Sequence, residues 1–401
     1  MIMQTLYKNF NLFDGLKPEI QKDVWFIVDS ESGEIVKLGF NDAPDCEKVV
    51  DLKGKYVMPG LINSHVHLMM NPITNKLEYL SEAEVTFTAL NNLKEALKAG
   101  VTYVRDCGCA FDVDIKLRRL QEEGQLGGTE IVPSGRPMCI TGGHADFTEG
   151  IDGETTWGHL VDSSDEMRHA VRRQFKLGAK NIKVMATGGV MSATDQIDDT
   201  EFSVDELKTA VAEAHTKHMT VAAHAEGTQG IHNAIIAGVD SVEHGCLISD
   251  DDIDLIKEKE IYLTPTVIAS YTIPTYGEGK LPSYMVDKAR SFLDKFYARM
   301  KVVNKAGVKL AFGTDAGTPF NRFADTSKEL ELLTKVGASN AEVLLAATKN
   351  SAHLLRIDDK YGSIQEGKIA DFLVLDHDPL ADVKAVQQVD KGVYKKGVKV
   401  Y

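Results

Sequence analysis

Short apolar runs alternate with amphipathic stretches through the central part of the chain. A helical pattern over about 81–98 is followed by an apolar run at 101–106, and the unit then recurs. At 203–206 the sequence Ser-Val-Asp-Glu has the capping-box pattern, and apolar residues follow it at helical spacing. Strands that alternate with helices indicate a parallel sheet, and eight such units predict a closed (β/α)8, TIM-like barrel. We therefore expect an α/β fold.

The predicted barrel covers residues 57–356. The first of its eight expected strands leads to His65 and His67, the second spans 101–106 and the third about 130–133. The fourth, fifth and sixth carry Lys183, His224 and His244, one each. The seventh spans 261–267, and the eighth leads to Asp315. In a barrel of this kind the carboxyl ends of the strands and the loops after them form the active-site face.

Both chain ends depart from this pattern. Residues 1–56 contain strand-like runs at 23–29 and 34–40, and the tail contains similar runs at 370–376 and 392–400. Each end is short for a core of its own. We therefore expect residues 1–56 and 357–401 to combine into one small β-sandwich domain beside the barrel.

Six polar residues terminate the apolar runs and are expected at one shared mouth. On an extended strand, residues i and i+2 face the same side, so His65 and His67 can reach one metal ion. Lys183 lies among apolar residues, and burial favours its neutral amine. Together the six form a ligand set for two divalent metal ions: His65, His67, Lys183, His224, His244 and Asp315.

Each of these signals is weak when taken alone. A lone histidine after an apolar run is more often a hydrogen-bonded core or rim residue than a ligand. The head of Lys183 could extend out of the sheet, and Asp315, which precedes Ala-Gly, could cap a turn or a helix. The common position of all six at strand ends is what favours a metal site.

Composition narrows the function classes. The chain has 401 residues, 43% of them hydrophobic, and a net charge of −14, which disfavours general binding to nucleic acid. No run approaches the roughly 20 apolar residues of a spanning helix, so we expect neither a membrane segment nor a signal peptide. Five cysteines do not form a disulfide framework, which predicts a reducing, cytoplasmic location. Cys107 and Cys109 lack the Cys-x-x-Cys spacing of a redox or metal motif.

Specific motifs resemble those of the amidohydrolase superfamily, in the branch of metal-dependent dipeptidases (Xaa-Pro and Xaa-Arg/Lys types) and imidazolonepropionase-like proteins. The resemblance covers nearly the whole chain, and its marks are Pro-Gly-Leu-Ile-Asn-Ser-His-Val-His at 59–67, Ile-Lys-Val-Met-Ala-Thr-Gly-Gly-Val-Met-Ser at 182–192, Ala-His-Ala at 223–225, Val-Glu-His-Gly at 242–245, Gly-Thr-Asp-Ala-Gly at 313–317 and a tail motif at 362–371.

The resemblance implies a role for each ligand. In binuclear members the lysine at the position of Lys183 is carboxylated by carbon dioxide and bridges both metals. By the same resemblance His65, His67 and Asp315 would hold the more buried metal, and His224 and His244 would hold the other. Zinc is the expected ion for this nitrogen and oxygen set, although the ligand types do not exclude manganese or cobalt.

The implied reaction is hydrolysis of an amide bond in a dipeptide or an N-acyl amino acid. A metal-bridging hydroxide would attack the carbonyl, Asp315 would accept its proton and pass it to the leaving nitrogen, and His144 would assist at the oxyanion. His144 follows the third strand, where it either touches substrate or orders its loop.

Substrate contacts are less well defined. His144 and Arg322 are candidates for the substrate carboxylate, and Arg322 could instead order its own loop. Some relatives carry a tyrosine where this chain has Glu226, a departure that puts a proline-dipeptidase assignment in doubt. Glu226 either favours a basic substrate side chain or bonds its own loop.

Three alternatives stay open. The first is an imidazolonepropionase-like lactam hydrolase, or another hydrolase of cyclic amides or carbamates, and the second is an aromatic-amine deaminase. The lactam hydrolases and deaminases of the resembled family usually hold one metal, which makes Lys183 an argument against them. The third is a non-catalytic scaffold, since a fold alone never proves activity. The expected partner is a small-molecule or dipeptide substrate, and the sequence leaves association between copies of the chain open.

Overall fold

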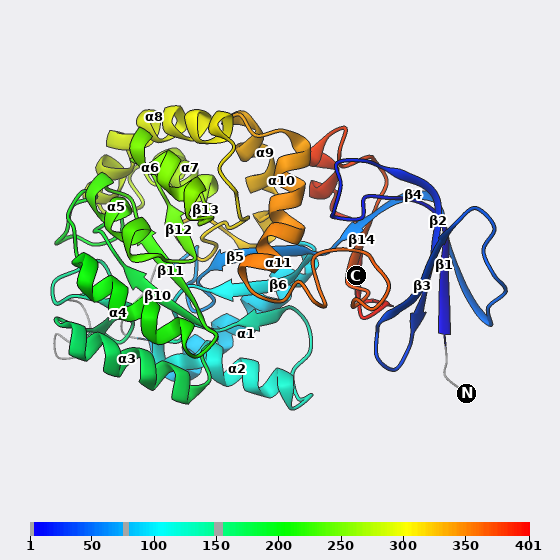
Figure 1. Ribbon diagram of the computed structural model, residues 1–401, viewed down its shortest axis with the longest axis horizontal. Helices are drawn as coiled ribbons and strands as arrows, with labels where there is room; N and C mark the ends of the chain where they lie inside the picture. Colours follow the sequence, from blue (N-terminus) through cyan, green and yellow to red (C-terminus); the bar gives the residue numbers. More distant parts are fainter. Residues whose placement is uncertain (1–3, 75–79, 148–154) are drawn as a thin grey trace.

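The computed structural model describes residues 4–74, 80–147 and 155–401. Helices and short parallel strands make up the larger part of the molecule, and a separate sheet built from both chain ends lies at one end of it (Figure 1). The helices are α1 (Glu82–Lys98), α2 (Val113–Glu122), α3 (Ser164–Leu177), α4 (Val204–His215), α5 (Thr228–Ala237), α6 (Asp250–Glu258), α7 (Val267–Tyr276), α8 (Ser283–Ala306), α9 (Lys328–Lys335), α10 (Asn340–Leu345) and α11 (Ser351–Leu354).

Local sequence explains how these helices begin. Ser203 caps α4 and exchanges hydrogen bonds with Glu206, as the capping-box pattern predicts. The apolar face of α4, which includes Leu207 and Val211, is buried. Ser81 and Glu84 form the same arrangement at the start of α1. Both helices therefore follow the sequence prediction.

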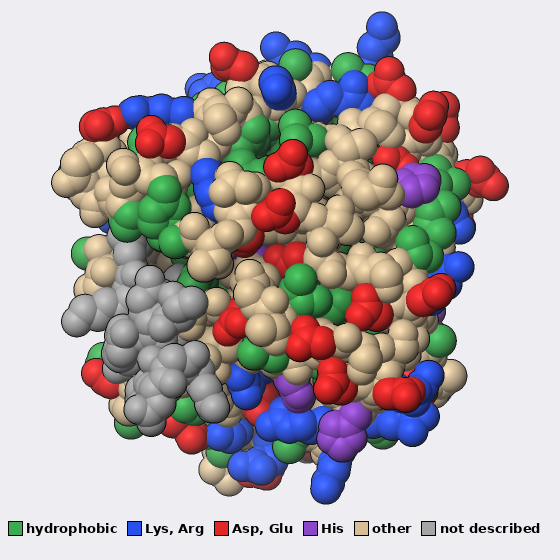
Figure 2. Space-filling model, turned by 90° about the vertical axis from the view of Figure 1, so that its left-hand side faces the viewer, with side chains coloured by type: hydrophobic (Ala, Val, Ile, Leu, Met, Phe, Trp, Pro, Cys, Tyr) green, Lys and Arg blue, Asp and Glu red, His purple; other side chains and the backbone are tan. Residues whose placement is uncertain are grey.

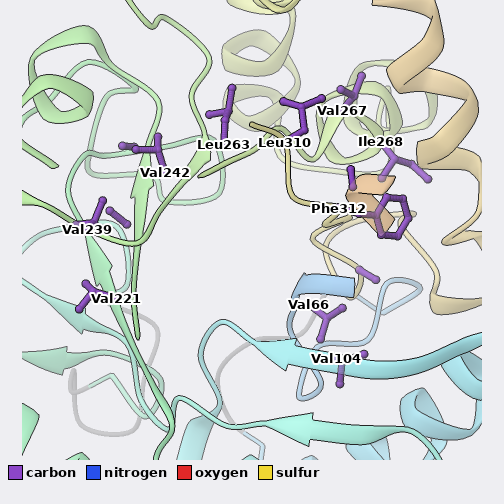
Figure 3. Packing of buried hydrophobic residues seen from close by; sticks show 14 of the residues in the cluster. Val66, Val104, Val221, Val239, Val242, Leu263, Val267, Ile268, Leu310 and Phe312 are labelled. Atoms are coloured by element: carbon purple, nitrogen blue, oxygen red, sulfur yellow. The ribbon is translucent and has the colours of Figure 1, made fainter. Parts of the chain in front are cut away.

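The parallel strands fall into two sheets. One has the order β5 (Leu61–Val66), β6 (Val101–Asp106) and β7 (Glu130–Val132). The other has the order β13 (Tyr262–Thr264), β12 (Ser241–His244), β11 (Thr220–Ala225), β10 (Asn181–Met185), β8 (Met138–Cys139) and β9 (His159–Leu160). Figure 3 shows apolar side chains of these strands, such as Val221, Val242 and Leu263, in the shared core. The strand pairing is thus not that of one closed sheet.

The predicted seventh and eighth strands need correction. The seventh strand is only three residues long, because Thr266 takes a left-handed conformation (φ 49°) and α7 begins at Val267. The segment 309–316 forms isolated bridges instead of a strand, because its backbone pairs first with β13 and then with β5. The amide of Ala311 donates to Leu263 of β13 at 2.9 Å, and the amide of Asp315 donates to His65 of β5 at 2.8 Å.

The chain ends share one seven-stranded sheet. Its order is β16 (Val398–Lys399), β15 (Gly392–Lys395), β14 (Phe372–Leu375), β4 (Lys48–Pro59), β1 (Gln4–Leu12), β2 (Gln21–Asp29) and β3 (Ile35–Phe40). The sequence led us to expect a two-sheet sandwich, but the long strand β4 joins both sets of strands because it pairs with β1 on one side and with β14 on the other. No helix in the described ranges combines the length and apolarity needed to cross a membrane.

Candidate metal centre

The six expected ligand residues lie together at the carboxyl ends of parallel strands. His65 and His67 come from the end of β5, Lys183 from β10, His224 from β11, His244 from the last position of β12, and Asp315 from the segment after Phe312. All six are buried or almost so, with Asp315 the most exposed at 9%. The chain therefore folds so that residues 250 positions apart meet.

Three residues converge on one point. Oδ1 of Asp315 lies 3.2 Å from Nε2 of His67 and 3.4 Å from Nε2 of His65. Nζ of Lys183 lies 3.4 Å from that same His65 nitrogen. Oδ1 of Asp315 is buried and finds no hydrogen-bond donor among the described residues. A buried oxygen without a donor is costly unless a cation is close. This group therefore fits a divalent metal ion.

A second group lies beside the first. His224, Glu226 and His244 each offer one ligand atom, and these atoms lie within 4.8 Å of one another. The rings of His224 and His244 are 4.7 Å apart, and the ring of His244 lies 5.0 Å from that of His65. The two groups are therefore neighbours, with Lys183 beside them.

Each of the four histidines forms a hydrogen bond through one ring nitrogen with a group outside the set of six ligands. Such a bond fixes the tautomer and leaves the other nitrogen for a metal. The four bonds are His65 Nδ1 to Glu243 (2.7 Å), His67 Nδ1 to the Gly108 carbonyl (3.2 Å), His224 Nε2 to the Gly188 carbonyl (3.1 Å) and His244 Nδ1 to the Thr266 hydroxyl (2.7 Å). The remaining nitrogens are Nε2 of three histidines and Nδ1 of His224.

Burial keeps the imidazoles of three of these histidines neutral. It lowers the pKa of His65, His224 and His244 well below the usual value, and neighbouring cationic groups lower it further. Neutral imidazole is the form that binds metals. The cluster is therefore prepared for ligation at neutral pH.

A buried ion pair supports His65. Nη2 of Arg105 donates to Glu243 at 2.7 Å, Nε of Arg105 donates to the Ser64 carbonyl at 2.6 Å, and both charged side chains are fully buried. This pair was not predicted from the sequence. The only signal was the position of Glu243 immediately before His244, and adjacent strand residues normally face opposite sides. His244 has a left-handed backbone (φ 68°), which changes the direction of the chain at that point.

His144 stands at the edge of the cluster. Its ring stacks on His224 with centroids 4.5 Å apart, and its Nδ1 bonds Asp195 at 2.8 Å. Lys288 from α8 pairs with Asp195 at 3.0 Å. The amide of His144 donates to Glu201. Burial raises the pKa of Glu201 to about 9. Asp195 and Lys288 were missed in the sequence because no fixed spacing links their loop and helix to His144.

The two other candidate substrate contacts differ in position. Glu226 is buried beside the cluster, and burial, helped by the negative charges of Asp195 and Asp315, raises its pKa to about 8. The side chain of Arg322 is 60% exposed and pairs with Asp325 at 2.8 Å. The structure thus brings Glu226 to the cluster and leaves Arg322 outside it.

A cavity opens above the cluster, and most of its wall is apolar. Metal-cluster residues, His144 and Glu226 line its floor. The apolar wall consists of Met70, Trp157, Met185, Val190, Met191, Ala269, Ile273, Ala289 and Phe292. Such a cavity fits a small molecule that carries both an apolar group and a polar group near the floor.

The end of the molecule away from the seven-stranded sheet shows several acidic side chains near its centre (Figure 2).

Four buried histidines, a buried lysine and a carboxylate at the ends of parallel strands fit the donor set of a divalent-metal-dependent hydrolase. A sequence model described as the amidohydrolase family matches residues 56–400. The chain therefore belongs to the amidohydrolase family. It is a hydrolase that acts on amide or other C–N bonds, and members of its family generally use divalent metal ions.

Similar proteins include several characterised hydrolases. The chain is 32% identical to the ochratoxinase of Aspergillus niger over 83% of this chain and 72% of that protein. It is 25% identical to the imidazolonepropionase of Fusobacterium nucleatum over 95% and 90%. A solved Xaa-Pro dipeptidase with bound methionine superposes with a TM-score of 0.90 at 32% identity over 99% of both chains. These neighbours support an α/β fold with an additional sheet domain, and their names differ in substrate.

Proposed function

We propose that this chain is a two-metal amide hydrolase that cleaves dipeptides or N-acyl amino acids. The observation that carries the proposal is the set of four back-side hydrogen bonds, which turns one nitrogen of each histidine toward a shared space that contains Lys183 and Asp315. A cluster with merely structural histidines would not need all four to be oriented this way.

His65, His67 and Asp315 would hold one ion and His224 and His244 the other, with zinc as the expected metal. Lys183, carboxylated on its amine, would be the shared ligand, because two cations stabilise an anionic carbamate in a buried place. When bound, the ions would supply a water of lowered pKa and polarisation of the scissile carbonyl.

The chain's own residues perform the remaining steps. Asp315 accepts the proton of the attacking water on its carboxylate and delivers it to the leaving nitrogen, since this side chain lines the cavity beside the cluster. Asp195 holds Nδ1 of His144, so that Nε2 faces the substrate. With both ring nitrogens protonated, His144 would donate from Nε2 to the carbonyl oxygen. The apolar wall of the cavity excludes bulk water, which strengthens both interactions.

The substrate class rests on the cavity and on the named relatives. An apolar wall above a polar floor fits an amide with a hydrophobic side chain, and the relatives include a Xaa-Pro dipeptidase and an ochratoxinase. His144 also remains a candidate partner for a substrate carboxylate.

The architectural part of the proposal is a closed (β/α)8 barrel over 57–356 with a second domain from 1–56 and 357–401. The backbone bonds of segment 309–316 to β13 and β5 support closure on one side. On the other side, the amide of Asn181 donates to the Pro133 carbonyl at 3.2 Å, between β7 and β10. A cytoplasmic location belongs to the same proposal.

Amino-acid release from a library of dipeptides and N-acyl amino acids tests the function. The enzyme is supplied with zinc and bicarbonate, and turnover concentrated in one class of C-terminal residue is expected. Silence across the library with two metals bound would contradict the substrate class and leave the hydrolase centre intact.

A second candidate is a lactam hydrolase, favoured by the likeness to imidazolonepropionase over 95% of this chain. It predicts turnover of cyclic amides and one metal per chain. Measured metal content together with a lactam assay separates the two candidates.

A further inference from the structure

Glu226 carries a buried carboxylate that the centre as described above leaves without a partner. The side chain is 6% exposed, lines the cavity, and its Oε2 finds no hydrogen-bond donor in the described part of the chain. Its backbone is already fixed, because its amide donates to the Thr187 hydroxyl at 3.0 Å and its carbonyl accepts from Leu247 at 2.9 Å. The carboxylate is therefore not needed to order its own loop.

Two lysines lie near enough to influence Glu226, but both are engaged elsewhere. Lys288 bonds Asp195 at 3.0 Å and the Ser192 carbonyl at 2.8 Å. Lys183 lies 3.4 Å from Nε2 of His65. An unpaired buried carboxylate is costly, and a cationic group from a ligand removes that cost.

The position of Glu226 limits which ligand cation can reach it. Its carboxylate lies within 4.8 Å of the ligand atoms of His224 and His244, which is where the scissile carbonyl would approach the second metal. The α-nitrogen of an aminoacyl group lies about 2.5 Å from its own carbonyl carbon, over one N–Cα and one Cα–C bond. The ammonium of a lysine side chain lies several bonds farther away and would project into the apolar part of the cavity.

We infer that Glu226 binds the free α-ammonium group of the substrate, so that the enzyme selects aminoacyl amides such as dipeptides over N-acyl amino acids. This inference rests on the proposed function and narrows it to one of its two substrate classes. Glu226 is then a substrate-binding residue, and the ion pair forms only when substrate is present.

The test compares two compounds that differ by one amino group. Leucyl and 4-methylpentanoyl derivatives of the same C-terminal residue are prepared with proline, arginine and phenylalanine. For the best C-terminal residue, wild-type kcat/KM for the leucyl compound is expected to exceed that of the des-amino compound by about 10- to 100-fold, the range of a hydrogen bond to a charged group. Equal values, or preference for the des-amino compound, overturn the inference.

The variant Glu226→Gln assigns this preference to the residue. It is expected to lower kcat/KM for the leucyl compound alone, so that the ratio falls toward one while metal content stays unchanged. A matched control is Glu329→Gln, another buried carboxylate, whose oxygens accept the amides of Val267 and Ile268 at 2.8 and 2.7 Å away from the cavity lining. The control is expected to keep the wild-type ratio.

The remaining outcomes are also decisive. Loss of metal from Glu226→Gln would make Glu226 a metal ligand and overturn the inference, as would an equal decrease for both compounds. Hydrolysis of neither compound by wild type, for any of the three C-terminal residues, would overturn the proposed function and the inference with it. Hydrolysis of both at equal rates would overturn only the inference. If Glu226→Gln does not fold, the wild-type ratio alone still decides.

Discussion

The two ends of the molecule bury different chemistry. The core of the seven-stranded sheet contains a group of aromatic rings. The ring centroid of Phe26 lies 5.3 Å from the ring centroids of Tyr7, Phe10 and Phe372. The metal centre buries histidines, a lysine and carboxylates, and two of their polar atoms, Oδ1 of Asp315 and Oε2 of Glu226, have no partner among the described residues. Apolar burial stabilises the fold, whereas buried polar atoms without partners cost free energy. The comparison indicates that the sheet contributes stability and that the centre is maintained for its chemistry.

The largest expected effect follows loss of the shared ligand. Lys183→Ala should remove one metal and lower kcat/KM by about 10³-fold, because metal ions supply several kcal/mol of transition-state stabilisation. The measurement is metal content with kinetics on the best library substrate. Arg322→Ala removes an exposed cation outside the cavity and should leave both within about twofold. Full activity of Lys183→Ala with two metals bound would contradict the bridging role.

The opposite pattern is expected in the sheet. Phe26→Ala should lower the free energy of unfolding by about 3–5 kcal/mol, because Phe26 is fully buried, and should leave kcat of the folded enzyme unchanged. Urea unfolding and kinetics measure the two effects. Phe87→Ala is the control, since Phe87 is 68% exposed, and it should change stability by less than about 0.5 kcal/mol. A large decrease in kcat for Phe26→Ala would remove the distinction between the two ends.

A smaller effect is expected beside the centre. Asp195→Asn should lower kcat by about 10²-fold, because the ring of His144 would lose the negative charge that fixes its orientation and protonation through Nδ1. Metal content should remain at the wild-type value, since Asp195 bonds no ligand side chain. Asp165→Asn, at an exposed position that is 93% accessible, is the control. An unchanged kcat would show that His144 has no part in the reaction.

The last effect concerns the pH dependence of stability. The pKa of Glu201 rises from 4.5 to about 9 on folding, mainly through burial. The folded protein therefore holds this proton more tightly than the unfolded chain, so stability is lost as pH rises from about 4.5 toward 9. Glu201→Gln keeps the acceptor for the His144 amide and should flatten this part of the stability curve. Urea midpoints at pH 5 and pH 8 measure the slope, with the exposed Glu258→Gln as control; an unchanged slope in Glu201→Gln would contradict the assignment.

Much of the metal centre could be predicted because each ligand is marked by the sequence immediately around it. The His-x-His pair at 65–67 and the polar residue at the end of each apolar run indicate one mouth without any knowledge of distances. Asp195 and Lys288 could not be found this way, since their contact joins a loop and a helix 93 positions apart. For Arg322 the sequence left two roles open, a substrate contact or a contact within its own loop, because proximity to Asp315 in the chain does not determine where the side chain points. In the structure it pairs with Asp325.

The fold was predictable to a similar depth. The capping box at 203–206 predicted the start of α4, and helical periodicity predicted α1, since both are local signals. The joining of both chain ends in one sheet through β4 depends on pairings more than 300 positions apart, such as Val57 with Val374. The short seventh strand follows from the left-handed Thr266, a conformation that a β-branched residue seldom takes.

The most direct test of the central claim is the number of metal ions per chain. Metal-free protein is titrated with zinc in the presence of bicarbonate, and bound metal is counted after removal of the excess. Two ions per chain are expected for wild type and one for Lys183→Ala. One ion or none in wild type would contradict the two-metal centre.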